Sequence, residues 1–277
     1  MQDNLEKWIK EAKRFYEQNE YEKAIEMYNK VLRSDPENID ALHEIGNIYY
    51  IKNMLPDALN AYTKYLAVCR SLGSYLELER KLIEKIGRVH FLEKNYSMAI
   101  SSYLEALAIY NQLEPEGSEP EEGKFHILHT IGDIYFSNLR DYGQALAIYK
   151  RLLELSYKWN SKEVVADNLR EIGTTLSKQK KFLEALEKFE EALDICTSEN
   201  IVSGKALTQY EIGRIYFKQK EYKKAFPYLD GALKVFIDLA DEEDFDDKDS
   251  FLNKTKRMWE AVKNELNRKS SNFTSEL

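Results

Sequence analysis

The chain has 277 residues, of which 43% are hydrophobic and 32% are charged, so it can build one or two domains or one elongated array. Its 40 basic and 48 acidic side chains give a formal net charge of −8, which argues against sequence-independent binding to a nucleic acid backbone. Cys69 and Cys196 lie far apart without metal-ligand spacing, which excludes a disulfide framework and a cysteine-based zinc site.

The first residues, MQDNLEKWIKEAK, are charged and contain no apolar signal core, and no stretch is long and apolar enough to span a bilayer. We therefore expect a cytoplasmic protein with no membrane insertion. Glycine and proline are scarce, with 11 and 5 residues, whereas Ala, Leu, Glu, Lys and Ile are common. This composition predicts an all-α fold.

Hydrophobic periodicity predicts twelve helices in six consecutive pairs, followed by a separate C-terminal helix. The expected ranges are 3–18, 20–33, 38–52, 55–72, 74–93, 96–113, 123–138, 142–158, 161–179, 182–197, 201–219 and 222–240. The long irregular connection is LEPEGSEPEEGK, from Leu113 to Lys124. Its prolines, glycines and glutamates predict a solvated surface loop.

A glycine recurs inside the first helix of five predicted pairs, although glycine costs about 1 kcal/mol relative to alanine in a helix interior. These glycines, 40 to 45 residues apart, are Gly46, Gly87, Gly132, Gly173 and Gly213, with Ala12 equivalent in the first pair. A second small residue follows twelve positions later, at Ala24, Ala58, Ala99, Ala185 and Ala225, and at Ala145 after one extra residue in SNLRDYG. We expect the glycine to face this alanine where the two helices approach closely.

A large side chain follows each alanine by four positions, at Tyr28, Tyr62, Tyr103, Tyr149, Phe189 and Leu229. This pattern resembles the tetratricopeptide repeat (TPR) family, and the first unit matches best. The matching residues there are Trp8, Ala12, Phe15, Ala24, Tyr28, Val31 and Pro36, whereas Glu11 stands where the family has leucine. The resemblance covers roughly residues 3–240, and six units keep the same register.

The resemblance implies a right-handed α-solenoid, or superhelix, of six helix hairpins. The expected units are 3–37, 38–73, 74–115, 123–160, 161–199 and 201–240. The one-sided apolar pattern of Phe251–Leu266 predicts a helix that caps the last hairpin. Residues 241–269 are therefore interpreted as an acidic linker and capping helix, and residues 270–277 as a disordered tail.

In the TPR family the first helices line a concave groove, so the resemblance predicts a peptide or partner helix bound there. The expected groove residues are Tyr16, His43, Asn47, Tyr50, Lys81, Arg88, Phe91, His129, Asp133, Phe136, Arg170, Tyr210, Arg214 and Phe217. Rings recur four residues after the small position in five units. They are expected either to contact the peptide or to pack against the next hairpin.

Two narrower site hypotheses follow from the groove positions. Asn47 and Arg88 match two positions of the carboxylate clamp of TPR adaptors, but the other clamp positions differ, so we expect at most a single carboxylate, held by Arg88 and Lys81. His126, His129 and Asp133 project from one helix, which indicates a polar contact site for a ligand rather than a metal site. No metal and no cofactor are predicted.

The sequence contains no nucleophile elbow, phosphate-binding glycine loop or zinc protease motif, so we do not expect an enzyme. The favoured function is a protein interaction module, an adaptor or scaffold for a protein or peptide partner, acting as a monomer or weak homodimer. The alternative is a ligand-responsive regulator resembling TPR receptors for bacterial signalling peptides. Those receptors usually carry an N-terminal effector, whereas this chain begins with a repeat.

Overall fold

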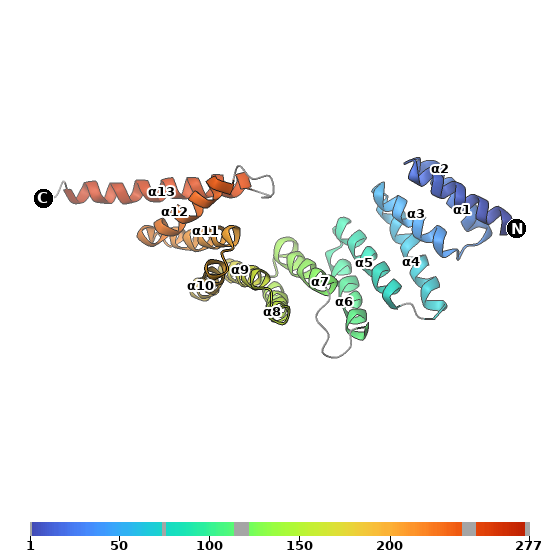
Figure 1. The fold of residues 1–277 in the computed structure, drawn as a ribbon, viewed down its shortest axis with the longest axis horizontal. Helices are drawn as coiled ribbons and strands as arrows, with labels where there is room; N and C mark the ends of the chain where they lie inside the picture. The colour runs from blue at the N-terminus through green and yellow to red at the C-terminus, as the bar shows by residue number, and fades with distance from the viewer. Residues whose placement is uncertain (1, 74–75, 114–121, 240–247, 275–277) are drawn as a thin grey trace. The chain divides into compact units, whose positions relative to one another are not determined.

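The computed structural model describes residues 2–73, 76–113, 122–239 and 248–274, and within these ranges all regular structure is helical (Figure 1). The all-α prediction is therefore confirmed. The elements are α1 Gln2–Glu17, α2 Tyr21–Ser34, α3 Ile39–Ile51, α4 Leu55–Ser71, α5 Leu76–Leu92, α6 Tyr96–Leu113, α7 Glu122–Asp133, the π-helical turn η1 Ile134–Leu139, α8 Tyr142–Lys158, α9 Lys162–Lys178, α10 Phe182–Ser198, α11 Val202–Lys218, α12 Tyr222–Leu239 and α13 Lys248–Thr274.

The helices form two compact units, Met1–Ser118 and Glu119–Leu277. The first unit contains the hairpins α1/α2, α3/α4 and α5/α6, and the second contains α7/α8, α9/α10 and α11/α12 together with α13. The sequence predicts one continuous array, and the boundary between the units falls in the expected loop Leu113–Lys124. Most of that loop lies outside the described residues, but its last three residues already belong to the first turn of α7.

The recurring glycines lie inside first helices and form notches that receive a large side chain from the second helix. A Cβ atom on Gly46 would lie 2.7 Å from the buried ring of Tyr62, and one on Gly132 would lie 2.8 Å from the ring of Tyr149. The atoms nearest to the notch belong to the ring, and not to the later alanine that the sequence predicts to face the glycine. Ala58 is fully buried, but the ring four residues beyond it fills the notch.

Each hairpin turn places one residue in the left-handed conformation that ends the first helix. These residues are Asn19, Asn53, Lys94, Arg140, Lys180 and Lys220. In the first hairpin the N–H of Glu20 then donates to the carbonyl oxygen of Phe15 at 2.8 Å, which satisfies an orphan carbonyl at the helix end.

The fourth hairpin accommodates the extra residue of SNLRDYG in the π-helical turn η1. There the N–H of Asp141 donates to the carbonyl oxygen of Tyr135 at 2.8 Å, and this bond spans one residue more than its counterpart in the first hairpin. The longer π turn absorbs the insertion. Ala145 is fully buried and the Tyr149 ring reaches the notch at Gly132, so α8 packs in the same register as the other second helices.

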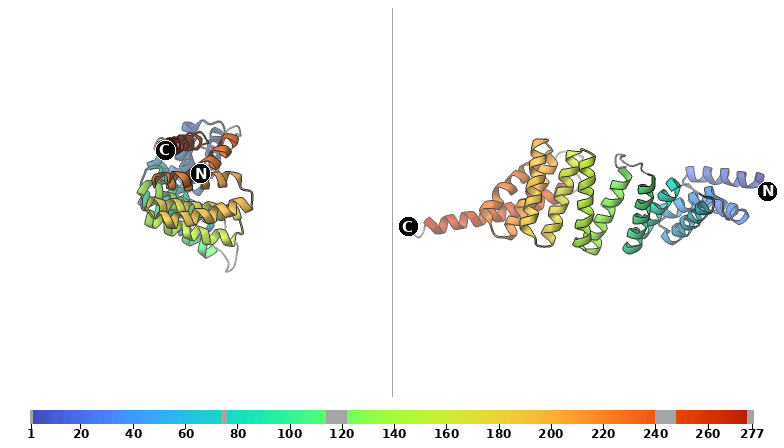
Figure 2. Two further views of the ribbon diagram at one scale, coloured as in Figure 1. Left: turned by 90° about the vertical axis from the view of Figure 1, so that its left-hand side faces the viewer. Right: turned by 90° about the horizontal axis from the view of Figure 1, so that it is seen from below.

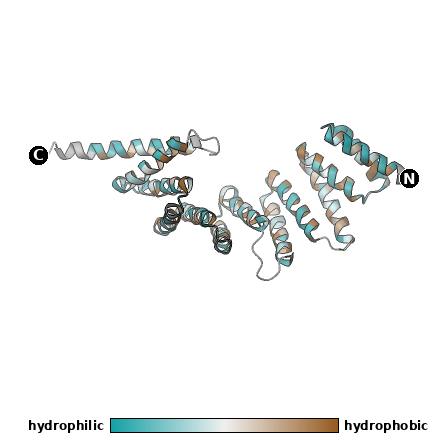
Figure 3. Ribbon diagram, in the orientation of Figure 1, coloured by the Kyte–Doolittle hydropathy of each residue, from teal (hydrophilic) through white to brown (hydrophobic). Residues whose placement is uncertain are grey.

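The core of each unit lies between helices, on the apolar faces that the hairpins present to one another. In the first unit, Tyr28, Val31 and Ile45 join Ala12 in one cluster. Figure 3 shows hydrophobic and hydrophilic residues interspersed along the helices, as expected for helices that bury one side and expose the other. Burial of these faces offsets the weak intrinsic stability of single helices.

Helix α13 packs along α12, as two further views show (Figure 2). Val262 is fully buried against the last hairpin, and the Trp259 indole donates to Asp230 at 3.0 Å. The helix is longer than the predicted 251–266, and its last residues, 270–274, fall in the segment predicted to be disordered. The linker 241–247 and residues 275–277 lie outside the described residues. Neither α13 nor another helix in the described ranges is long and apolar enough to cross a lipid bilayer.

Candidate functional site

A pocket of about 290 Å³ opens in the first unit, where α1, α3, α4 and α5 meet. Its lining residues are Tyr16, Asn47, Tyr50, Ile51, Tyr62, Lys85 and Arg88. Three of these side chains are tyrosines and two are cations. The structure thus brings together four of the predicted groove residues and adds Tyr62, Lys85 and Ile51.

The amide of Asn47 connects three helices in this pocket. Its Oδ1 atom accepts hydrogen bonds from the Tyr62 hydroxyl at 2.9 Å and from Lys85 Nζ at 2.7 Å. Lys85 Nζ also lies 3.2 Å from Nε2 of His43, and Asn47 Nδ2 lies 3.3 Å from the same atom. Because its ammonium group is held from two sides, Lys85 is a fixed positive charge in the pocket wall.

The pocket of the first unit carries two cations, Lys85 and Arg88, with the Glu44 carboxylate behind Asn47 and His43. Burial lowers the pKa of Lys85 below its usual value; the Glu44 carboxylate opposes this shift, and the neighbouring Arg88 adds to it. Burial, followed by the charge of Lys85, lowers the pKa of His43, so this imidazole is neutral at pH 7. Within the described part of the chain, neither Lys85 nor Arg88 has a carboxylate at ion-pair distance. A carboxylate from a ligand could form a direct ion pair with these two cations.

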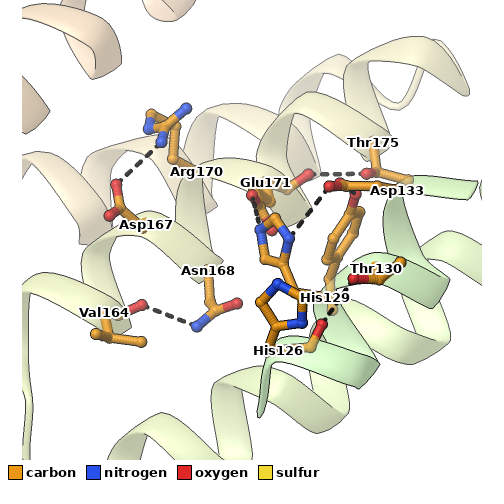
Figure 4. A network of polar contacts seen from close by, with 11 residues as sticks. His126, His129, Thr130, Asp133, Val164, Asp167, Asn168, Arg170, Glu171 and Thr175 are labelled. Atoms are coloured by element: carbon orange, nitrogen blue, oxygen red, sulfur yellow. Dashed lines mark hydrogen bonds and ion pairs between the residues drawn. The ribbon is translucent and has the colours of Figure 1, made fainter. Parts of the chain in front are cut away.

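A second cluster of polar side chains joins α7 to α9 in the second unit. Figure 4 shows the His129 ring between the carboxylates of Asp133 and Glu171. Its Nδ1 atom lies 3.1 Å from Oδ2 of Asp133, and its Nε2 atom lies 2.9 Å from Oε1 of Glu171. The Tyr149 hydroxyl donates to Oδ1 of Asp133 at 2.8 Å. A small pocket of about 190 Å³ opens beside Asp133, Tyr149 and Glu171.

The two carboxylates determine the charge of the imidazole in this cluster. Hydrogen bonds to Asp133 and then Glu171 raise the pKa of His129 to about 10, so the ring is an imidazolium at pH 7. Burial acts to raise the pKa of Asp133, but the hydrogen bond and charge of His129 and the bond from Tyr149 bring it below its usual value. The Oε2 atom of Glu171 is buried and has no hydrogen-bond partner among the described residues.

The pocket of the first unit and the cluster of the second are built from the same repeat positions. In both, a histidine lies three residues before the glycine. The residue after the glycine is Asn47 in the first unit and Asp133 in the second. The tyrosine that fills the notch donates a hydrogen bond to this Asn47 or Asp133 side chain. The next hairpin contributes the residue two positions before its own glycine, which is Lys85 in one case and Glu171 in the other.

The position two residues before the glycine is absent from the predicted groove residues. The residues there are Glu44, Lys85, Thr130, Glu171 and Glu211. The sequence does contain a signal for this position. Its residue is a lysine at the start of KIGRVHF and a glutamate at the start of EIGTTLS, so its charge changes sign between the two units. Lys81, which the sequence predicts as a partner of Arg88, is exposed, pairs with Glu77 at 3.2 Å and does not line the pocket. The structure places Lys85 there instead.

Four of the five predicted groove rings pack inside their own hairpin. Each contacts a ring at the start of the second helix. The centroid separations are 5.9 Å for Tyr16 and Tyr21, 5.9 Å for Phe91 and Tyr96, 5.5 Å for Phe136 and Tyr142, and 6.0 Å for Phe217 and Tyr222. These rings therefore brace the hairpin turns; Tyr16 also lines the pocket of the first unit, together with Tyr50.

The remaining predicted residues of the second unit are engaged locally. Arg170 pairs with Asp167 at 2.9 Å on the same helix, and Arg214 pairs with Glu211 on its own helix. Tyr210 is buried, with its ring 5.4 Å from that of Phe251 in α13. Since α13 covers it, Tyr210 belongs to the core and is not a groove residue.

Family comparisons agree with the repeat positions seen in the structure. A family described as "TPR repeat" matches residues 12–53, and families described as "Tetratricopeptide repeat" match residues 124–198 and 206–235. The chain is a tetratricopeptide repeat protein. The three matches fall in both units and include Asn47, His129, Asp133 and Glu171.

Among curated proteins, this TPR protein is 28% identical over 241 residues to "Response regulator aspartate phosphatase I" of Bacillus subtilis (strain 168), covering 82% of this chain and 57% of the relative. It is 25% identical to "TPR repeat-containing protein MJ1428" of Methanocaldococcus jannaschii, covering 83% of this chain and 38% of that protein. The chain thus spans about half the length, or less, of these relatives.

Solved structures show the same fold. The apo form of RapI matches with a TM-score of 0.65 at 22% identity, over 95% of this chain and 72% of that one. BtubC from P. vanneervenii matches with a TM-score of 0.57 at 17% identity, over 87% and 94% of the two chains. These similarities support an α-solenoid of TPR hairpins.

Proposed function

We propose that this TPR protein is a non-catalytic interaction module that binds an acidic segment of a partner protein or peptide in the pocket of the first unit. The observation that carries the proposal is the pair of cations, Lys85 and Arg88, in a pocket walled by tyrosines. A partner carboxylate, from an aspartate, a glutamate or a chain end, bonds to these cations. An apolar side chain next to it packs against the rings.

The electrostatics of the pocket favour this ligand chemistry. Lys85 and Arg88 repel each other, and a bound carboxylate relieves that repulsion. A hydrogen bond to a charged group contributes about 1.5–3 kcal/mol, so two such bonds make the carboxylate the anchor of the complex. Asn47 holds Lys85 in place before the ligand arrives, which reduces the entropy lost on binding.

A displayed library of random peptides tests this proposal and does not require the natural partner. Selection on the full chain is expected to enrich peptides that contain Asp or Glu next to apolar residues. Binding of a selected peptide, measured by fluorescence polarisation, should weaken at least about tenfold in Lys85→Glu and in Arg88→Glu, because each removes a charge-assisted bond and introduces repulsion.

The matched control is Lys64→Glu, which makes the same charge change at an exposed position of α4 outside the pocket. This variant should bind the selected peptides like the wild type. Enrichment without acidic residues, or equal loss of binding in Lys64→Glu, would contradict an anionic anchor in the pocket.

A second candidate function is a ligand-responsive regulator. It is supported by the match to the B. subtilis relative, which extends over 82% of this chain at 28% identity. In this case the peptide changes the arrangement of the hairpins as well as occupying the pocket. Small-angle scattering with and without a selected peptide distinguishes the two candidates. An unchanged scattering curve supports a passive adaptor, and a ligand-dependent change supports a regulator.

A further inference from the structure

We propose that the cluster on α7 and α9 in the second unit is a binding site for a divalent transition-metal ion, with Zn²⁺ as its best-fitting ligand. His129 and Glu171 bind the ion, Asp133 orients His129, and water completes the coordination. This inference is independent of peptide binding in the first unit. It rests on the positions of donor atoms, on charge and on a buried oxygen without a partner.

The donor atoms are close to the spacing that a zinc ion requires. One ligand atom each from His129, Asp133 and Glu171 lies within 4.8 Å of the others. Two ligands of a tetrahedral zinc ion, at about 2.0–2.1 Å from it, lie about 3.4 Å apart. Nε2 of His129 and Oε1 of Glu171 are 2.9 Å apart, so a small rotation of the glutamate side chain opens the gap.

The other imidazole nitrogen already has the partner expected of a metal ligand. Histidines that bind metals usually donate their second N–H to a carboxylate, which fixes the ring and makes the free nitrogen a better donor. Nδ1 of His129 lies 3.1 Å from Asp133, and the Tyr149 hydroxyl holds that carboxylate from the opposite side at 2.8 Å. This side of the cluster is preorganised.

Charge and hydrogen bonding also favour a cation. Asp133 and Glu171 supply two negative charges, which equal the charge of one divalent ion. Oε2 of Glu171 is buried without a hydrogen-bond partner among the described residues, and an ion at the carboxylate would satisfy it. Figure 4 shows His126 and His129 on the side of α7 that faces α9, consistent with their spacing of three residues. The small pocket beside the cluster leaves room for a water ligand.

The mixed ligand set decides which ion fits best. Imidazole nitrogen suits Zn²⁺ and other late first-row ions, whereas Mg²⁺ and Ca²⁺ prefer oxygen alone. The ion takes the place of the proton on Nε2 of His129, and that proton is released to solvent. We therefore expect Zn²⁺ to bind and Mg²⁺ to bind at least about 100-fold more weakly.

Isothermal titration of the chelator-treated full chain with ZnCl₂ at pH 8 tests the site. One ion should bind per chain, and His129→Gln and Glu171→Gln should each weaken binding at least about tenfold, because each removes a ligand. The control Glu187→Gln removes an exposed carboxylate from α10 and should leave the affinity unchanged. Absence of stoichiometric binding, or wild-type affinity in His129→Gln or Glu171→Gln, would overturn the proposal.

A measurement on the wild-type chain covers the case in which a variant does not fold. Long-range ¹H–¹⁵N spectra report the ring nitrogens of all four histidines. Zinc should shift the signals of His129 and leave those of His43 and His90 in place. Shifts confined to His43 or His90, or no shift at all, would place any zinc outside the cluster and reject the site.

Discussion

The pocket of the first unit and the cluster of the second use equivalent repeat positions but carry opposite charges. In the first, Lys85 donates to Asn47, and in the second, Asp133 and Glu171 both contact the His129 ring. Both are supported by a tyrosine whose ring fills a glycine notch. The comparison shows that equivalent positions of the TPR hairpin hold the polar groups of both sites, whereas the residue two positions before the next glycine differs in charge between them.

The largest expected effect comes from filling a glycine notch, since each site depends on the tyrosine that occupies it. Gly46→Val and Gly132→Val should each lower the free energy of unfolding by about 3 kcal/mol, because the new side chain collides with a buried ring. Urea denaturation measures this loss. Gly143→Ala is the control, because a Cβ there meets the end of the Asp141 side chain and no ring.

If Gly46→Val and Gly132→Val were as stable as the wild type, the notches would not position the tyrosines. The shared architecture of the two sites would then lose its physical basis.

An exchange of charges should exchange the ligand preferences of the two sites. Lys85→Glu is expected to weaken binding of acidic peptides at least about tenfold and to raise the pKa of His43, because a carboxylate replaces a neighbouring cation. Glu171→Lys is expected to lower the pKa of His129 and to abolish zinc binding. Peptide binding by Glu171→Lys should remain at the wild-type level.

The outcome that would contradict this exchange is a Glu171→Lys chain that has lost peptide binding, or a Lys85→Glu chain that keeps it. Either result would mean that the two sites are not determined separately by these residues.

The smallest effect is expected from removal of the two tyrosine hydroxyls. Tyr62→Phe removes a bond to the neutral amide of Asn47 and should cost about 1 kcal/mol, whereas Tyr149→Phe removes a bond to the carboxylate of Asp133 and should cost about 1.5–2 kcal/mol. Thermal unfolding at pH 7 measures both. If Tyr62→Phe and Tyr149→Phe lowered the free energy of unfolding equally, the carboxylate of Asp133 would not be charged where it accepts the bond from Tyr149.

Much of the fold could be predicted because it depends on periodicity along one chain. The glycine period identified the hairpins, and the extra residue before Ala145 is the one that η1 absorbs. The large side chain as the nearest neighbour of each recurring glycine could not be predicted, because the alanine and the large side chain four residues later share a helix face. The boundary between the two compact units falls in a segment that reads only as a loop in the sequence.

The candidate sites could be predicted in part. Asn47, Arg88, His129 and Asp133 follow from the face of the first helix, which helical geometry determines. Lys85 and Glu171 do not, because their contacts reach the preceding hairpin and depend on how consecutive hairpins pack. Whether the rings at the hairpin turns contact a ligand could not be predicted, since their spacing does not separate contact with a ligand from contact with the ring five or six residues later.

The most direct test of the opposite charges is an NMR titration of the imidazole rings in chelator-treated wild-type protein. His43 is expected to lose its proton below pH 6.5, because burial and the charge of Lys85 lower its pKa. His129 is expected to keep its proton through pH 9, because Asp133 and Glu171 raise its pKa to about 10. If both rings titrated together near pH 6.5, the charge difference between the two sites would be refuted.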